Sequence, residues 1–305
     1  MSSPGPLVLA VPVFNAAPYL AATLQSLRAQ GEHVRWWLQD GASTDTTVEI
    51  ARSFARPEDT IVSEPDQGQA DALNRAFAKM GGEVIGFING DDILTPGTAE
   101  RVVRFFHDHP HVDLIYGCVE WMDSTGKVTG FHRGQIGSLA EMPDIYNVWW
   151  GNRQWVQPEV FFRRSLYERV GGFDTQWHLA FDYDFWVRCM LAGARVAHTP
   201  AMTTQFRLHP AQKSAAATRA ADEIRAIVQR HLAHASIGAW QRLRLKAAMS
   251  YDSYQSGRAT PAGKTRLPFL AALLTHPHWL LSPLVRRRTQ SSLAKALPFR
   301  QPSAK

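Results

Sequence analysis

Short apolar segments alternate with amphipathic ones along the first part of the chain, and this alternation limits the fold more than any other feature. The apolar segments at 7–13, 34–38, 61–62 and 84–88 predict buried strands. The segments between them carry apolar residues every three or four positions, which predicts helices that pack on a sheet. Strict alternation favours parallel strands with right-handed crossovers, and ligands then bind beyond the carboxyl ends of the strands.

The predicted helices have recognisable starts. Pro18 suits the first turn of the first helix, and Thr44 or Asp45 is suited to cap the second. The third helix should run from 69 to 80, and the Thr95-Pro96 pair should open the fourth. Polar clusters therefore fall where predicted strands end and helices begin.

Beyond Leu114 the alternation gives way to an apolar strand, a Ser-Thr-Gly turn and the pattern of an antiparallel partner strand, so we expect a mixed sheet. The other predicted elements of this part are strands at 157–162, 195–198 and 203–208 and a helix at 182–192. Helical spacing dominates from 218 to 256. We therefore expect a domain over residues 1–215 and a helical extension over residues 216–305.

Charge is distributed unevenly along the chain. The net charge is +6, but nine Lys and Arg residues and no acidic residue follow Asp252, so the body before it is net acidic. This distribution argues against nucleic acid as a partner of the body.

The sequence predicts a cytoplasmic protein. It begins without a basic segment followed by a long apolar one, so no signal peptide is expected. The most apolar later segment, 267–285, is interrupted by Pro277 and Pro283, and no membrane-spanning helix is expected. Cys118 and Cys189 lie far apart, which fits a reducing compartment or plain core positions.

Carboxylates at strand ends are the main candidates for chemistry. Asp91 and Asp92 follow the apolar segment EVIGFI, and adjacent carboxylates repel each other unless a cation lies nearby. Mg²⁺ and Mn²⁺ prefer such oxygen ligands and complete their coordination with phosphate oxygens and water. Asp40 and Asp66 also stand near glycines, where turn composition alone could explain them.

Six segments together resemble family 2 glycosyltransferases. They occur in that family's order: VPVFNAAPYLAATLQSL, QDGASTDTT, SEPDQGQADALNRAF, FINGDD, GGFD and FDYDFWVR. The resemblance extends from about Leu7 to Ser214. It implies a GT-A fold, an α/β/α three-layer sandwich with a mixed, mostly parallel sheet, and a hexosyltransferase that inverts the sugar of a nucleotide-sugar donor with the help of Mn²⁺ or Mg²⁺.

The resemblance also implies roles for residues on the donor side. Pro12, Phe14 and Asn15 would line the nucleotide pocket, Asp40 would contact the base or ribose, and Asp66 would belong to the same wall. The family's Asp-x-Asp element falls on Asn89, Gly90 and Asp91, so an amide replaces its first carboxylate. Asp91 would therefore carry most of the cation binding.

On the acceptor side, the family's Glu-Asp pair falls on Phe181 and Asp182, so the first acid is lost. Asp182 would be the catalytic base, although an Asp there could also be only a helix N-cap. His209 matches a histidine that binds metal or phosphate. Gln157 and Trp186, with Trp155, are candidates for binding the acceptor sugar, but tryptophan is also common in cores.

Partners follow from the same resemblance and from the tail. The donor would be a UDP-, GDP- or dTDP-sugar, and the acceptor a glycan or a lipid-linked molecule in polysaccharide or glycolipid synthesis. In the tail, Leu270, Leu274 and Trp279 precede three consecutive arginines, which suits peripheral binding to an anionic membrane on the cytoplasmic side. Packing of this helical extension on the body is the alternative.

Two other functions fit parts of the sequence. A nucleotidyltransferase that makes nucleotide sugars could use a related sheet, but the first strand leads into FNAAPYL and not into a Gly-rich phosphate loop. A binding protein that kept the donor pocket and lost turnover would explain the departures at Asn89 and Phe181.

Overall fold

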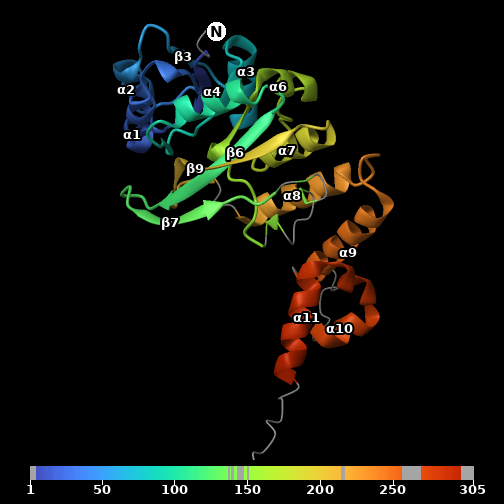
Figure 1. Ribbon diagram of the computed structural model, residues 1–305. Coiled ribbons are helices and arrows are strands. Elements are labelled where there is room, and N and C mark those ends of the chain that lie inside the picture. The colour runs from blue at the N-terminus through green and yellow to red at the C-terminus, as the bar shows by residue number, and fades with distance from the viewer. Residues whose placement is uncertain are drawn as a thin grey trace, which may run out of the picture. The chain divides into compact units, whose positions relative to one another are not determined.

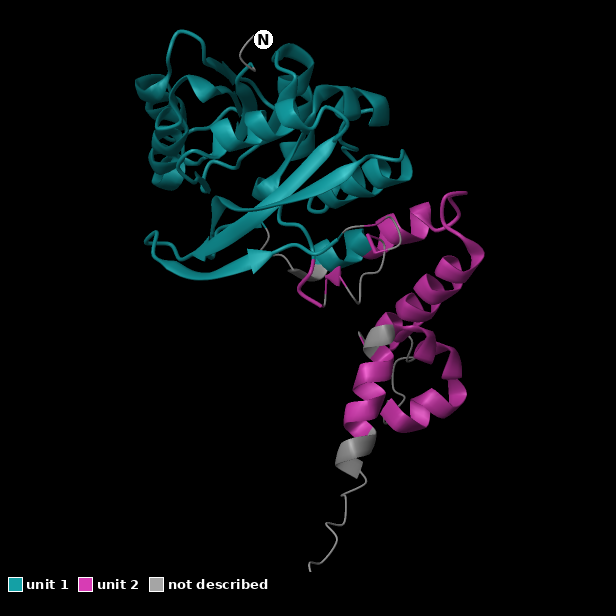
Figure 2. Cartoon of the chain, viewed as in Figure 1, with its two compact units in different colours: residues 1–137, 154–224 teal, residues 138–153, 225–305 magenta. Residues whose placement is uncertain are grey.

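The computed structural model describes residues 5–136, 138, 141–142, 148–149, 151–213, 217–255 and 269–296. The chain forms two compact units, drawn in different colours in Figure 2: residues 1–137 with 154–224, and residues 138–153 with 225–305. We call them unit 1 and unit 2. The predicted boundary at 215–216 lies outside the described residues, so the extent of the catalytic domain stays a prediction.

One mixed sheet forms the centre of unit 1. Among the described residues its strands are β1 (Leu7–Val13), β2 (Val34–Asp40), β3 (Thr60–Ser63), β4 (Val84–Phe87), β5 (Ile93–Leu94), β6 (Leu114–Met122), β7 (Val128–Arg133), β8 (Val160–Arg163) and β9 (Val196–Arg207). Their order is β3-β2-β1-β4-β8-β6-β9-β5, and β7 pairs with β6. The predicted mixed sheet is confirmed.

Parallel pairing brings the ends of the first strands to one edge. β1 pairs with β2 and β4, and β2 with β3, all in parallel. In this register Val13 lies opposite Asp40, and Asp40 lies opposite Ser63. The polar residues that follow these strands therefore emerge side by side, as the sequence predicts.

The second half of the sheet differs from the prediction in two places. Residues 157–159 form a 3₁₀ turn, because Pro158 cannot donate to a strand ladder, and β8 begins only at Val160. The two strands expected at 195–198 and 203–208 are one continuous strand, β9, which runs parallel to β6 as Figure 1 shows. Its pairing with β6 shifts register beside Cys118, and this irregularity lies between the two predicted segments.

Helices cover both faces of the sheet. They are α1 (Ala17–Arg28), α2 (Thr47–Phe54), α3 (Gln69–Lys79), α4 (Thr98–Asp108), α6 (Arg164–Val170) and α7 (Phe181–Leu191), and α8 (Ala217–His231) begins in unit 1 and ends in unit 2. On one face Leu20 and Leu24 of α1 and Val102 of α4 join the core residues of β1 and β2. On the other face Phe77 of α3 contacts the aromatic rings of β8 and α6. The predicted three layers are therefore confirmed.

Unit 2 has a small core of its own. Its helices include α9 (Ala239–Gln255), α10 (Phe269–Thr275), η4 (Pro277–Leu281) and α11 (Pro283–Ala296). Trp279 is buried against Tyr251 and Leu273, and its indole N–H donates to Ser250 Oγ at 3.0 Å. No helix in the described part of the chain has both the length and the apolar character that crossing a bilayer requires.

Candidate active site

Polar contacts tie together the loops that follow β1 and β2. The buried carboxylate of Asp40 accepts hydrogen bonds from the Ser63 hydroxyl at 2.6 Å and from both the N–H and the hydroxyl of Ser43. Asn15, in a left-handed conformation with φ of 50°, donates its N–H to Ser43 Oγ at 2.7 Å and accepts from Thr44 N at 2.9 Å. Asp40 therefore shapes the predicted nucleotide pocket, and its contact with a base or ribose stays a prediction.

The three further residues of the predicted donor pocket lie in or beside these loops. Phe14 exposes 64% of its surface directly after β1, whereas Pro12 is buried within the strand. Asp66 Oδ1 accepts from Gly68 N at 2.7 Å, and a Cβ at Gly41 would lie 2.7 Å from the other Asp66 oxygen. Glycine at 41 thus permits Asp66 to approach the loop after β2, and the predicted donor residues are brought together.

The side-chain amide of Asn89 is the centre of a hydrogen-bond network. Its oxygen accepts from Gln69 Nε2 at 2.7 Å, and its nitrogen donates to Gln157 Oε1 at 3.0 Å and to Asp92 Oδ2 at 3.2 Å. Gln157 Nε2 in turn donates to the Phe87 carbonyl at 2.6 Å. A carboxylate at position 89 has no N–H to give to two acceptors, which explains why an amide stands there.

Gly90 and Asp92 hold the following turn against the rest of the sheet. A Cβ at Gly90 would lie 2.8 Å from Val13 Cγ1 and 3.3 Å from Ala16 Cβ, so this backbone packs directly on the loop after β1. Asp92 is buried and accepts from Arg207 N at 3.0 Å. Burial and then the charge of Asp91 raise the pKa of Asp92 well above its ordinary value. Asp92 therefore has a structural role, which the sequence did not separate from that of Asp91.

Asp91 and His209 meet, as the resemblance predicts. His209 Nε2 lies 2.9 Å from Asp91 Oδ2, and the imidazole packs on the Tyr19 ring at 4.7 Å. Arg207 lies over the same tyrosine and donates to the Asp91 carbonyl at 2.9 Å. The described residues contain no group of three or more His, Cys, Asp and Glu side chains that could hold a metal. One oxygen and one imidazole nitrogen still fit a cation that takes its other ligands from phosphate and water.

Asp182 lies in the first turn of α7 and is not its N-cap, a position that Ala180 occupies. The half-buried carboxylate accepts from its neighbour Tyr183 N at 2.7 Å. Burial raises the pKa of Asp182 to about 6, while Lys213 opposes this rise and the charge of Glu223 adds to it. The Asp182 carboxylate is therefore ionised at neutral pH and also basic enough to accept a proton.

A chain of contacts connects the donor motif with the start of α7. Lys213 Nζ donates to Gln69 Oε1 at 3.2 Å, and Gln69 is bonded to Asn89. The same ammonium lies 5.4 Å from the centre of the Phe181 ring. The donor motif and Asp182 therefore lie at the same edge of the sheet, as a shared site requires.

The two tryptophans proposed for the acceptor lie in the core. Trp155 and Trp186 are 1% and 2% exposed and pack edge to face at 5.7 Å. Trp155 also stacks on Tyr116. Gln157 uses both ends of its amide within the Asn89 network, and acceptor binding by Gln157 and Trp186 stays a prediction.

The sequence did not point to Glu223, which stabilises the start of α7 from α8. Its carboxylate accepts from the backbone N–H groups of His178, Leu179 and Ala180, at 3.2, 2.7 and 2.8 Å. A carboxylate at a helix N-terminus also interacts favourably with the helix dipole. No local sequence motif predicts such a contact, since Glu223 lies more than 40 residues from Ala180 along the chain.

Comparison with known proteins agrees with this geometry. Residues 8–171 match the family model described as "Glycosyl transferase family 2", which is more than half of the chain. The chain therefore belongs to glycosyl transferase family 2 and is a glycosyltransferase. This assignment favours glycosyl transfer over both the nucleotidyltransferase and the non-catalytic alternatives.

One relative and two solved structures illustrate the assignment. A "PGL/p-HBAD biosynthesis glycosyltransferase" of Mycobacterium bovis is 31% identical over 202 residues, which cover 64% of this chain and 71% of the relative. S. aureus TarS 1-349 in complex with UDP-GlcNAc has a TM-score of 0.63 at 16% identity and covers 97% of this chain and 93% of its own. The mannosyltransferase PcManGT of Pyrobaculum calidifontis, in complex with GDP-Man and Mn²⁺, has a TM-score of 0.53 at 20% identity and covers 98% and 90%.

These similarities establish the GT-A fold of the chain. The chain spans 50% of the longer S. aureus TarS chain, so the activity of that whole protein does not transfer with the fold.

Replacing Glu223 with Gln should loosen the start of α7. The variant loses charge-assisted hydrogen bonds, which should lower the free energy of unfolding by about 1–3 kcal/mol. Hydrogen exchange of the amides of residues 178–180 should become faster, while Glu49→Gln on the exposed side of α2 should change neither quantity. Unchanged exchange at these three amides would show that the Glu223 contacts contribute nothing in solution.

Proposed function

We propose that this glycosyltransferase inverts the anomeric centre as it moves a sugar from a nucleoside diphosphate sugar to a hydroxyl acceptor. The observation that carries the proposal is the Asp182 carboxylate, which has a raised pKa and lies at the same edge of the sheet as the donor motif. In such a transfer the acceptor oxygen attacks the anomeric carbon opposite the diphosphate. Asp182 accepts the hydroxyl proton as the new bond forms.

Asp91 and His209 are the residues that would hold a divalent cation. Their side-chain atoms meet at 2.9 Å, and Asp91 is 28% exposed at its side chain, so incoming phosphate oxygens can reach it. A bound Mn²⁺ or Mg²⁺ would stabilise negative charge on the leaving diphosphate. Asn89 contributes no charge to this site because an amide is neutral, and its amide oxygen and nitrogen are already bonded to Gln69 and Gln157.

For the donor we propose a UDP-, GDP- or dTDP-sugar. The loops after β1 and β2 offer the exposed ring of Phe14 and the polar groups of Asn15 and Asp66. The TarS and PcManGT structures carry UDP-GlcNAc and GDP-Man respectively, which supports this class of ligand. The acceptor we propose is a glycan or a lipid-linked molecule, in polysaccharide or glycolipid synthesis.

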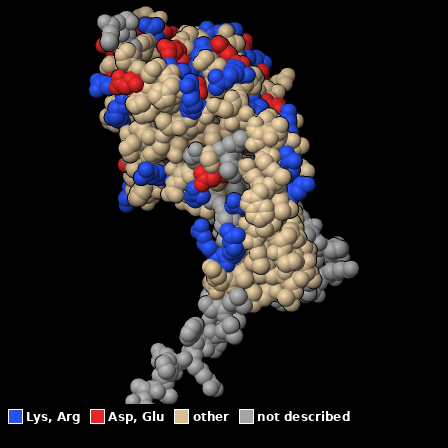
Figure 3. Space-filling view, turned by 45° about the vertical axis from the view of Figure 1, so that its right-hand side comes forward, with Lys and Arg blue, Asp and Glu red and all other residues tan. Residues whose placement is uncertain are grey.

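Unit 2 carries features that suit peripheral binding to an anionic membrane on its cytoplasmic side. Leu274 is 85% exposed on α10, and Arg286 and Arg287 are exposed on α11. From residue 225 onward Asp252 is the only acidic residue, and it pairs with Arg225. Figure 3 shows Lys and Arg side chains gathered beside an uncharged area in its lower part. Exposed apolar side chains beside exposed arginines fit a surface of anionic lipid headgroups.

Replacing Asp182 with Asn should lower the turnover of the donor by about 10²- to 10⁴-fold without loss of donor binding. The donor for this assay is the UDP-, GDP- or dTDP-sugar that raises the melting temperature of the wild type most. Asp108→Asn, at the exposed end of α4, is the matched control. Unchanged turnover in Asp182→Asn would remove this residue from the role of base.

The raised pKa of Asp182 leads to two further expected results, one for turnover by the wild type and one for the stability of Asp182→Asn. Turnover by the wild type should fall about tenfold per pH unit below about pH 6, because the base is then protonated. A carboxyl group whose pKa is raised in the folded state destabilises that state increasingly as pH rises from its unfolded-state pKa, about 4, to the raised value, and by a constant amount above it. Asp182→Asn should therefore raise the free energy of unfolding by about 1–2 kcal/mol at pH 8 and leave it unchanged below about pH 4.

Asp91→Asn should weaken the activation by Mn²⁺ at least about tenfold, because a charged oxygen ligand is lost. The measurement is donor hydrolysis as a function of Mn²⁺ concentration after treatment with EDTA, again with Asp108→Asn as control. Full activity of the wild type in EDTA would contradict the proposed use of a cation.

The membrane proposal predicts salt-sensitive binding to vesicles that contain phosphatidylglycerol. Replacing Arg286 and Arg287 together with Ser should weaken the binding about 10- to 30-fold, at about 1 kcal/mol for each arginine. The matched control replaces Arg28 and Arg52, two exposed arginines of unit 1, with Ser. Equal binding by the Arg286/Arg287 variant and the wild type in cosedimentation would exclude this surface.

A further inference from the structure

Lys213 is placed where the two departures from the family's motifs meet. The first departure, Asn89, is bonded to Gln69, and Gln69 accepts from the Lys213 ammonium at 3.2 Å. The second departure, Phe181, presents its ring to the same ammonium at 5.4 Å. In both places the family's acid is missing, and in both the uncharged replacement is connected to one lysine.

The Lys213 ammonium has nearby carboxylates but few hydrogen-bond acceptors. Its ammonium interacts electrostatically with the carboxylates of Asp182, Glu223 and Asp66. Glu223, however, is already bonded to three backbone N–H groups at the start of α7. Of the described residues, only Gln69 accepts a hydrogen bond from Nζ, whereas an ammonium has three N–H groups to give.

The side chain of Lys213 is also accessible. It is exposed to solvent and lies between Asn89, at the donor side, and Asp182, at the acceptor side. A donor that spans these two residues would carry its diphosphate past the ammonium. Replacing the two lost acids by uncharged side chains makes this position more attractive to an anion, because two negative charges that would repel a diphosphate are absent.

We propose that the Lys213 ammonium binds the diphosphate of the donor sugar and neutralises part of its charge. The proposal rests on the nucleotide-sugar activity described above. A fixed positive charge at the diphosphate stabilises the leaving group as the bond to the sugar breaks, and a charge-assisted hydrogen bond to phosphate is stronger than a neutral one. Asn89 cannot hold a cation as a carboxylate at that position would. The positive charge of Lys213 takes over part of the neutralisation that such a cation would provide.

A purely structural role for Lys213 makes a different prediction. If the ammonium only balanced Asp182, its removal would raise the pKa of that carboxyl group and affect all nucleotides alike. A diphosphate-binding role instead distinguishes nucleoside diphosphates from nucleoside monophosphates. The number of phosphates on the probe therefore separates the two roles.

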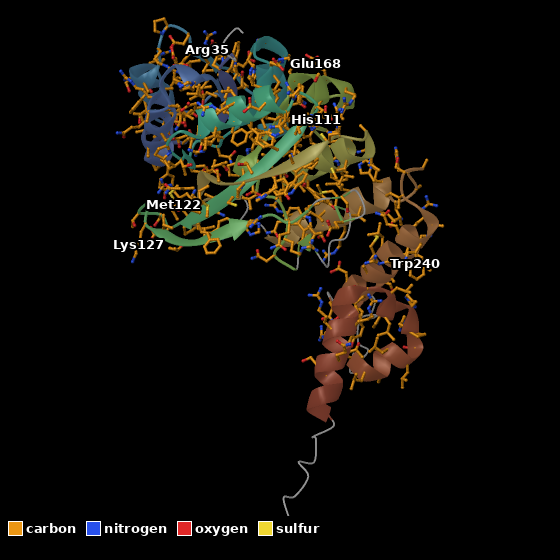
Figure 4. All side chains as sticks on the ribbon, viewed as in Figure 1. Arg35, His111, Met122, Lys127, Glu168 and Trp240 are labelled. Atoms are coloured by element: carbon orange, nitrogen blue, oxygen red, sulfur yellow. The ribbon has the colours of Figure 1, made fainter. Side chains whose placement is uncertain are left out.

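The test is a calorimetric titration of UDP, GDP and dTDP and of the matching monophosphates UMP, GMP and dTMP in the presence of EDTA. Lys213→Met should weaken binding of the preferred diphosphate at least about tenfold and that of the matching monophosphate less than about threefold. Lys213→Arg keeps the charge and should bind within about threefold of the wild type. Lys127→Met, in the turn between β6 and β7 that Figure 4 labels, is the control and should bind as the wild type does.

Each remaining outcome overturns a specific claim. Equal diphosphate affinity in Lys213→Met and the wild type rejects the proposed role, and so does an equal loss for diphosphate and monophosphate. Failure of the wild type to bind any of the three diphosphates, in EDTA or in Mn²⁺, would reject the proposed donors together with the role of Lys213. A thermal melt of each variant verifies folding, and Lys213→Gln replaces Lys213→Met if the latter does not fold.

Discussion

The rest of the site depends on the hydrogen bonds made by the side-chain amide of Asn89. It joins α3 through Gln69, the turn before β8 through Gln157, and the buried Asp92. Two of these contacts need an N–H donor, and a third carboxylate beside Asp91 and Asp92 would add repulsion in a buried place. The departure from the Asp-x-Asp pattern thus follows from the packing of this protein, and it reduces the charge available to a cation.

The surroundings of Asp182 reflect a balance of opposing effects. Burial and the neighbouring Glu223 raise the pKa of its carboxyl group, and Lys213 limits the rise. Glu223 is held by the backbone of residues 178–180, so the same side chain stabilises the start of α7 and acts on the base. The family's motifs have lost two acids in this chain, and the charged residues that surround the site instead, Lys213 and Glu223, lie outside those motifs.

Most of the architecture of unit 1 could be predicted because local patterns and global fold agree there. Buried strands such as Leu7–Val13 are apolar throughout, and their helices show a clear apolar stripe. The errors lie where local pattern is ambiguous. The turn at residues 157–159 follows from Pro158, and the continuity of β9 depends on its pairing with β6. Strand pairing is a long-range property that a single segment does not encode.

By itself, the sequence determined the alternation of elements and the strand ends at which polar residues gather, and its resemblance to family 2 glycosyltransferases pointed to Asp91, Asp182 and His209 as candidates. Tertiary structure alone decided which polar groups meet. The contacts of Lys213 with Gln69 and of Glu223 with the start of α7 join residues 144 and about 44 positions apart. Such contacts arise because folding buries polar groups that must then find partners, and nothing in the spacing of the residues along the chain specifies which partners those are.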